Sequence, residues 1–212
     1  MKNIENFSKS EELTNAITHG VGLALSIAAL VILVVFASLR GDGWYVTSFA
    51  VYGVTLVILF AASTLYHSYP EGKLKDLFEI FDHSAIFLLI AGSYTPLMLV
   101  SLRGVLGWSL FGVVWGIAIG GVVLKAFYVK KYVILSTLLY LVMSWMIIFA
   151  LKPLMANVSR LSLTFLFIGG TFYTLGTIFY VWRKLKYHHG IWHLFVLIGS
   201  VCHFFTILFL LD

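Results

Sequence analysis

Charged side chains divide the chain into seven long stretches that contain no Asp, Glu, Lys or Arg. Each stretch has at least 20 residues, and together they cover residues 13–39, 43–70, 83–102, 104–124, 132–151, 161–182 and 187–211. A helix needs about 20 residues to cross a bilayer core about 30 Å thick. The stretches do not alternate between apolar and polar positions, as the strands of a transmembrane barrel would. The pattern therefore predicts seven membrane-spanning helices, because a helix satisfies its own backbone hydrogen bonds in lipid.

The predicted spans use almost the whole chain. We place them at approximately residues 16–39, 44–67, 82–102, 105–125, 132–151, 161–182 and 188–211. Since the linkers are only a few residues long, residues 1–212 are expected to form a single seven-helix membrane domain of the all-α class. The first span is too long for the apolar core of a signal peptide, and two glutamates precede it. We expect it to remain in the mature protein.

Composition excludes the main alternatives. Hydrophobic residues make up 61% of the chain and charged residues 11%, against about 25% charged residues in soluble domains. So few charges could not cover a soluble domain, and so apolar a chain is not intrinsically disordered. Cys202 is the only cysteine, which excludes an internal disulfide framework.

Basic residues predict the orientation. Of the 14 Lys and Arg residues, ten precede or follow spans on the side of the N-terminus. The other four lie on the opposite side: Arg40, Arg103, Lys152 and Arg160. Because cytoplasmic loops carry the excess of Lys and Arg, we expect a cytoplasmic N-terminus and an external C-terminus. The net charge of +5 then reports orientation, and no nucleic-acid partner is expected.

Three local patterns predict details of packing. Ser8 with Glu11 forms a capping box, which is expected to start a short helix before the membrane. Pro96 should bend or break the third span. Small residues four apart on the fourth span should allow another helix to approach closely; they are Gly112, Gly116 and Gly120.

All histidines lie inside the uncharged stretches. They are His19, His67, His83, His188, His189, His193 and His203. Ionisable groups are costly in a membrane and tend to mark functional sites. In the predicted topology all of them except His203 lie near the cytoplasmic ends of their spans, where Asp82 also lies. Polar chemistry is therefore expected at one end of the bundle.

Spacing sharpens this expectation. His189 and His193 are four residues apart, so they lie on one helical face about 40° apart. Two imidazoles at that spacing can chelate one metal ion. His203 lies about 15 Å further along the same helix and cannot easily share that ion. Two further sets also share a helical face: Ser63 with His67, and Glu12 with Asn15 and His19.

Each of these residues also has a simpler interpretation. A lone pair of histidines at that spacing is a weak signal, and His67 alone is explained by an interhelical hydrogen bond. Asp82 could cap a helix, and Glu12 could complement a helix dipole. Three imidazoles and a carboxylate on three helices at one depth nevertheless make a metal site an equal alternative.

The same residues form the motifs of a known family. The chain resembles the haemolysin III family, within the progestin and adipoQ receptor superfamily, and looks like its short bacterial-type branch. The resemblance covers essentially the whole chain. The motifs are Glu12-x-x-Asn15-x-x-x-His19-Gly20, Ser63-x-x-x-His67, Phe81-Asp82-His83-Ser84-Ala85-Ile86, Ala91-Gly92-Ser93-Tyr94-Thr95-Pro96 and His189-Gly190-Ile191-Trp192-His193.

The resemblance implies a seven-helix integral protein of a bacterial-type cell membrane, with a zinc ion on the cytoplasmic side. By position, His67, His189 and His193 would be the zinc ligands. Asp82 would hold the reacting water, and Ser63 would lie beside His67. The remaining motif would support the site through Glu12, Asn15 and His19.

Three functions are compatible with these residues. The first is a zinc-dependent, ceramidase-like hydrolase of a lipid amide or ester, with membrane lipid as its partner and substrate. The second is a non-enzymatic membrane protein in which zinc is structural. The third is a membrane-permeabilising or transport protein, which is disfavoured because no Asp, Glu, Lys or Arg lies near the centre of a span.

Overall fold

Helices account for nearly all of residues 7–212, the part of the chain that the computed structural model describes, and this part contains no β-strand. The α-helices are α1 (Lys9–Arg40), α2 (Gly43–Ser68), α3 (Lys73–Pro96), α4 (Val105–Tyr128), α5 (Val133–Trp145), α6 (Leu151–Asn157), α7 (Arg160–Val181) and α8 (His188–Leu208). Three short helical segments join or extend them: η1 (Leu97–Ser101), η2 (Met146–Ala150) and η3 (Phe209–Leu211). Seven of the resulting rods in residues 7–212 are long and apolar enough to cross a membrane, which confirms the predicted class of fold.

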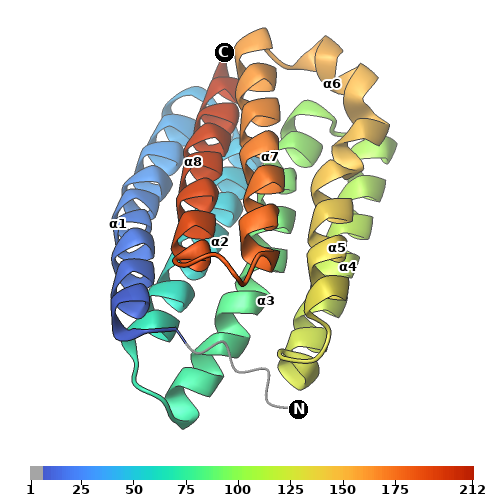
Figure 1. The fold of residues 1–212 in the computed structure, drawn as a ribbon. Coiled ribbons are helices and arrows are strands. Elements are labelled where there is room, and N and C mark those ends of the chain that lie inside the picture. Colours follow the sequence, from blue (N-terminus) through green and yellow to red (C-terminus); the bar gives the residue numbers. More distant parts are fainter. Residues whose placement is uncertain (1–6) are drawn as a thin grey trace.

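Consecutive spans run in opposite directions along the bundle (Figure 1). Helix α1 lies at one edge beside α8, whereas α4 and α5 lie at the other edge. The starts of α1 and α8 lie at the same end, which we call the N-terminal end, and the C-terminus lies at the opposite end. Residues that are far apart in sequence at the starts of α1, α3 and α8 and at the end of α2 therefore share one end of the molecule.

The start of α1 carries the predicted capping box. The Ser8 hydroxyl accepts from the Glu11 N–H at 3.3 Å, and the Glu11 carboxylate accepts from the Ser8 N–H at 2.9 Å. The expectation of a separate short helix is wrong, because α1 continues without a break from Lys9 to Arg40. The capping box is therefore the start of the first span itself, and the residues expected to form a separate helix are the first turns of α1.

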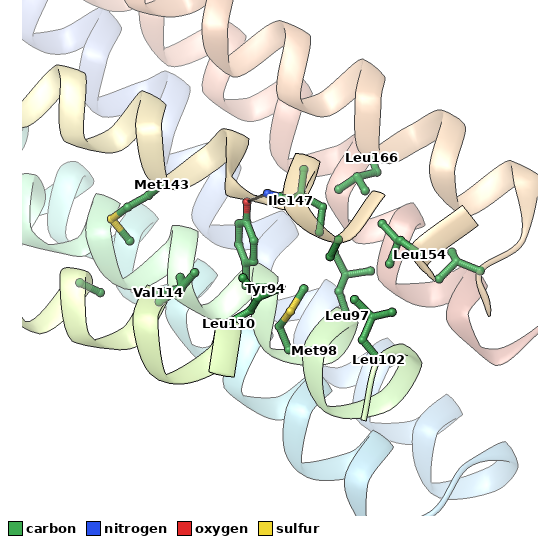
Figure 2. Packing of buried hydrophobic residues seen from close by; sticks show 14 of the residues in the cluster. Tyr94, Leu97, Met98, Leu102, Leu110, Val114, Met143, Ile147, Leu154 and Leu166 are labelled. Carbon is green, nitrogen blue, oxygen red and sulfur yellow. Dashed lines mark hydrogen bonds between the residues drawn. The ribbon is translucent and has the colours of Figure 1, made fainter. Parts of the chain in front are cut away.

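The third and fifth spans both depart from regular α-helix in their second halves. After Pro96 the third span continues as the π-helix η1, and the fifth span passes through the 3-10 segment η2. The Tyr94 hydroxyl joins these irregular parts: it donates to the Ser144 carbonyl at 2.9 Å and accepts from the Ile147 N–H at 2.7 Å (Figure 2). This hydroxyl satisfies backbone groups that the break in the fifth span would otherwise leave unpaired.

The glycines of the fourth span do not form the expected helix contact. A β-carbon added at Gly112, Gly116 or Gly120 would meet no atom of residues 7–212 within 4 Å, apart from its chain neighbours and the nearby backbone of its own helix. That face of α4 therefore has no partner helix in the described part of the chain. The close approach occurs instead at Gly121, where a β-carbon would lie 2.5 Å from ring carbons of Phe87.

Apolar side chains form the interior and also cover the outside of the bundle. One buried cluster joins α3, η1, α4 and the fifth span, with Met98, Val114 and Met143 fully buried (Figure 2). Many large aliphatic residues on the outer faces remain exposed, among them Ile17 and Val142. So much exposed apolar surface would aggregate in water but is compatible with lipid, so the protein is an integral membrane protein.

Candidate metal centre

Three buried histidines meet at the N-terminal end of the bundle. His67 lies in the last turn of α2, and His189 and His193 lie in the first two turns of α8. One ring nitrogen from each lies within 4.8 Å of the others, and this is the only such group of His, Cys, Asp or Glu among residues 7–212. The ring centroids of His189 and His193 lie 4.6 Å apart, as expected for residues one turn apart on one face.

Helix α1 supplies no ligand to this group but holds two of its members. The Nδ1–H of His67 donates to Glu12 Oε2 at 2.6 Å. The Nδ1–H of His193 donates to the Asn15 carbonyl at 3.2 Å, with Thr18 Oγ1 at the same distance. A metal-ligating histidine commonly donates its other ring N–H to a carboxylate or carbonyl. In both residues, Nε2 is the nitrogen left for a metal.

The donor set therefore fits a metal ion. His67 Nε2 is buried and has no hydrogen-bond partner among the described residues. Leaving such a group unpaired costs free energy, which a ligated ion would recover. Neutral imidazoles suit zinc and several other transition metals. Three such ligands could hold one metal ion, with a further coordination position open to a small molecule.

The two predicted catalytic residues lie in the same part of the structure, Ser63 near His67 in sequence and Asp82 on a cavity shared with two of the histidines. Ser63 is fully buried one turn before His67, and its hydroxyl has no hydrogen-bond partner within residues 7–212. Asp82 lies in the third turn of α3, outside the group of possible ligands, and lines the same cavity as His189 and His193. Its carboxylate also lies 3.8 Å from Nδ1 of His83.

The other two predicted supporting residues, Asn15 and His19, also contact the group. The His19 ring stacks on His193 with centroids 3.4 Å apart and the planes 13° from parallel. Phe60 contacts the other side of His19 edge-on at 5.0 Å. Asn15 Nδ2 lies 3.5 Å from His67 Nδ1. The first motif therefore touches both His67 and His193.

A mainly apolar cavity of about 100 Å³ leads from the histidines into the bundle. Asp82, His19 and His193 line its N-terminal end. Tyr94 and His203 line its deeper part, where His203 packs edge-on against Tyr173 at 5.1 Å. The cavity therefore extends from the histidine group into the bundle, and His203 lies apart from the metal-binding group.

Sequence reasoning missed three residues of the site. Phe7 packs against His189, with ring centroids 5.0 Å apart. Thr18 contacts His193, and Lys75 is buried in an ion pair with Glu12. From the sequence, Lys75 is one of the ten basic residues on the side of the N-terminus, and it lies seven residues before Asp82 and hence on the same helical face. That spacing was the available signal.

Comparison with known proteins decides the family. The family model described as "Haemolysin-III related" matches residues 7–204. The chain belongs to the haemolysin III family. Two family relatives are the "Hemolysin-3 homolog" of Bacillus subtilis (strain 168), 52% identical over 96% of this chain and 95% of that protein, and the "Hemolysin-3" of Bacillus cereus, 51% identical over 94% and 91%.

The haemolysin III family also has distant relatives in animals. The human "Monocyte to macrophage differentiation factor" is 29% identical over 93% of this chain and 83% of that protein. This match confirms the predicted link to the progestin and adipoQ receptor superfamily. No solved structure matches the chain.

Proposed function

We propose that this protein is a zinc-dependent hydrolase of a lipid amide or ester, similar in activity to a ceramidase. The observation that carries the proposal is the group formed by His67, His189 and His193, with Asp82 lining the same apolar cavity as two of these histidines. Three protein ligands with an open position are typical of catalytic zinc, whereas structural zinc usually has four. Bound zinc would lower the pKa of a water molecule and polarise a substrate carbonyl.

The chain's own residues would carry the remaining steps. The Asp82 carboxylate accepts a proton from the attacking water, and later returns it to the leaving nitrogen or oxygen. The carbonyl carbon gains an oxygen and loses its C–N or C–O bond, which gives a fatty acid and an amine or alcohol. Ser63 orients His67 or donates to the developing oxyanion. The apolar cavity lining suits an acyl chain that arrives from the membrane.

The first experiment is to measure the metal content of the purified protein by elemental mass spectrometry. The wild type should contain about one zinc per chain, and the variant with both His189→Ala and His193→Ala should contain almost none. His203→Ala is the matched control, because this histidine lies on the same helix away from the ligand group. Well-folded wild type without any bound metal would contradict the proposal.

A second experiment separates catalytic zinc from structural zinc. Asp82→Asn should keep zinc and thermal stability but lose turnover of a panel of acyl amides and esters, since an amide cannot accept the proton. If zinc were structural, the wild type would itself show no turnover on that panel.

The names of the bacterial relatives favour a second candidate, a protein that permeabilises membranes. Zinc-independent leakage from liposomes at low protein density would support it. We rank it lower, because all the histidines except His203 gather at one end and do not form a polar path through the bundle.

A further inference from the structure

A chain of polar contacts links Lys75 to the metal-binding group through Glu12. Glu12 Oε2 accepts from His67 Nδ1 at 2.6 Å, and Glu12 Oε1 accepts from the Lys75 ammonium group. The three residues come from three helices: Glu12 from α1, His67 from α2 and Lys75 from α3. One carboxylate thus uses both of its oxygens, each for a different helix.

Lys75 is itself fixed in place. It is 8% exposed, and its ammonium group lies 3.5 Å from both the Tyr69 carbonyl and the Glu71 carboxylate. It also lies 5.4 Å from the centre of the Tyr66 ring. A buried charge has to be paired, so Lys75 keeps the Glu12 carboxylate in this place and in this orientation.

The consequence for His67 is a choice of tautomer. A neutral imidazole carries its proton on one nitrogen only, and a carboxylate can only accept. The Glu12 contact therefore keeps the proton on Nδ1 and leaves the lone pair on Nε2. Nε2 is the atom without a hydrogen-bond partner among the described residues.

We propose that Lys75 and Glu12 are positioning residues that hold His67 in its metal-binding tautomer and orientation. The proposal rests on the zinc site of the proposed function. A merely structural role is the rival explanation, in which the ion pair only ties α1 to α3. The two explanations differ in what happens to zinc affinity and to the His67 tautomer in variants that remain folded.

The first test is competition for zinc between the detergent-purified protein and a chromophoric chelator. Glu12→Met should weaken zinc binding by about 10- to 100-fold, the usual cost of losing a group that orients a ligand. Glu12→Gln keeps an acceptor and should lie between Glu12→Met and the wild type. Lys75→Met should also weaken zinc binding, whereas Lys75→Arg keeps the positive charge and should retain most of the wild-type zinc affinity.

Lys130→Met is the matched control. Lys130 also pairs with two carboxylates, at 2.9 Å from Asp76 and 3.0 Å from Glu79. Neither carboxylate contacts a candidate ligand through these ion pairs. Its replacement should leave zinc affinity unchanged. Equal zinc affinity of Lys130→Met, Lys75→Met and Glu12→Met, all folded, would overturn the proposal.

The second test needs no metal. Nitrogen-15 NMR of metal-free protein should show His67 with its proton on Nδ1, and Glu12→Met should shift the proton toward Nε2. An unchanged tautomer in folded Glu12→Met overturns the positioning role. If the tautomer responds but the wild type binds no zinc, the proposed function fails while the control of His67 by Glu12 stands.

Discussion

At the scale of single residues, Phe7 packs against the histidine group at the N-terminal end of the bundle. Its ring centroid lies 5.0 Å from that of His189 and 5.8 Å from that of His67. The Glu11 carboxylate accepts from the Tyr187 N–H at 3.0 Å, which ties the start of α1 to the start of α8. Phe7 therefore covers part of two candidate ligands and does not itself line the cavity.

This cover predicts slow exchange of a bound metal. Replacing Phe7 with Ala should speed the loss of zinc to a chelator several-fold, because water and chelator then reach the ligands directly. The rate can be followed by the absorbance of the chelator complex after rapid mixing. Phe127→Ala is the control, since this phenylalanine is 75% exposed and has no contact with the histidines. Equal rates in the two variants and the wild type would show that Phe7 is no barrier.

The residues of the site were predictable to different degrees. The spacing of His189 and His193 and the depth of His67 are properties of the sequence, so their meeting at one end could be anticipated. Phe7 and Lys75 could not be assigned in the same way. The spacing of Lys75 from Asp82 indicates only a shared helical face, and the contacts of Phe7 and Lys75 depend on side-chain directions where α1, α2, α3 and α8 meet.

At the scale of helices, two glycines that are adjacent in the sequence of α4 face different surroundings. The Gly120 face is open, whereas the Gly121 face is closed by the Phe87 ring. Neighbouring positions on a helix point about 100° apart, so one substitution tests each face. This pair corrects the expectation that the Gly112, Gly116 and Gly120 series contacts another helix of the chain.

The two alanine substitutions should therefore have different effects on the melting temperature. Gly120→Ala should leave the melting temperature unchanged or raise it, because Ala favours helix over Gly by up to about 1 kcal/mol. Gly121→Ala should lower it, since overpacking costs about 1–3 kcal/mol. Thermal unfolding of both purified variants in detergent checks this. A similar loss in both would mean that the Gly120 face has a partner.

The ends of the helices were predicted best where charged residues mark them, and least well where packing against other helices determines them. The uncharged stretches located all seven spans, because the cost of burying charge in lipid is large. The third span begins earlier than expected, at Lys73, since its charged first turns lie beyond the apolar stretch. The 3-10 break in the fifth span had no sequence signal, and it is stabilised from outside by the Tyr94 hydroxyl.

At the scale of the whole molecule, the orientation of the bundle in the membrane decides on which side of the membrane the site lies. The histidine group and the loop before α8 share the N-terminal end, and the α6 segment lies at the opposite end (Figure 1). The excess of Lys and Arg at the N-terminal end predicts that this end is cytoplasmic. The candidate site would then draw its water from the cytoplasm and its lipid from the membrane.

Cysteine labelling of intact cells tests this orientation. Lys152→Cys in α6 and Lys184→Cys before α8 both place a thiol at an exposed position, at opposite ends of the bundle. The native Cys202 is buried and should contribute little background. A membrane-impermeant maleimide should label Lys152→Cys in intact cells but Lys184→Cys only after permeabilisation. The reverse pattern would place Glu12, Lys75 and the histidines outside the cell, and zinc and water would then have to come from that side.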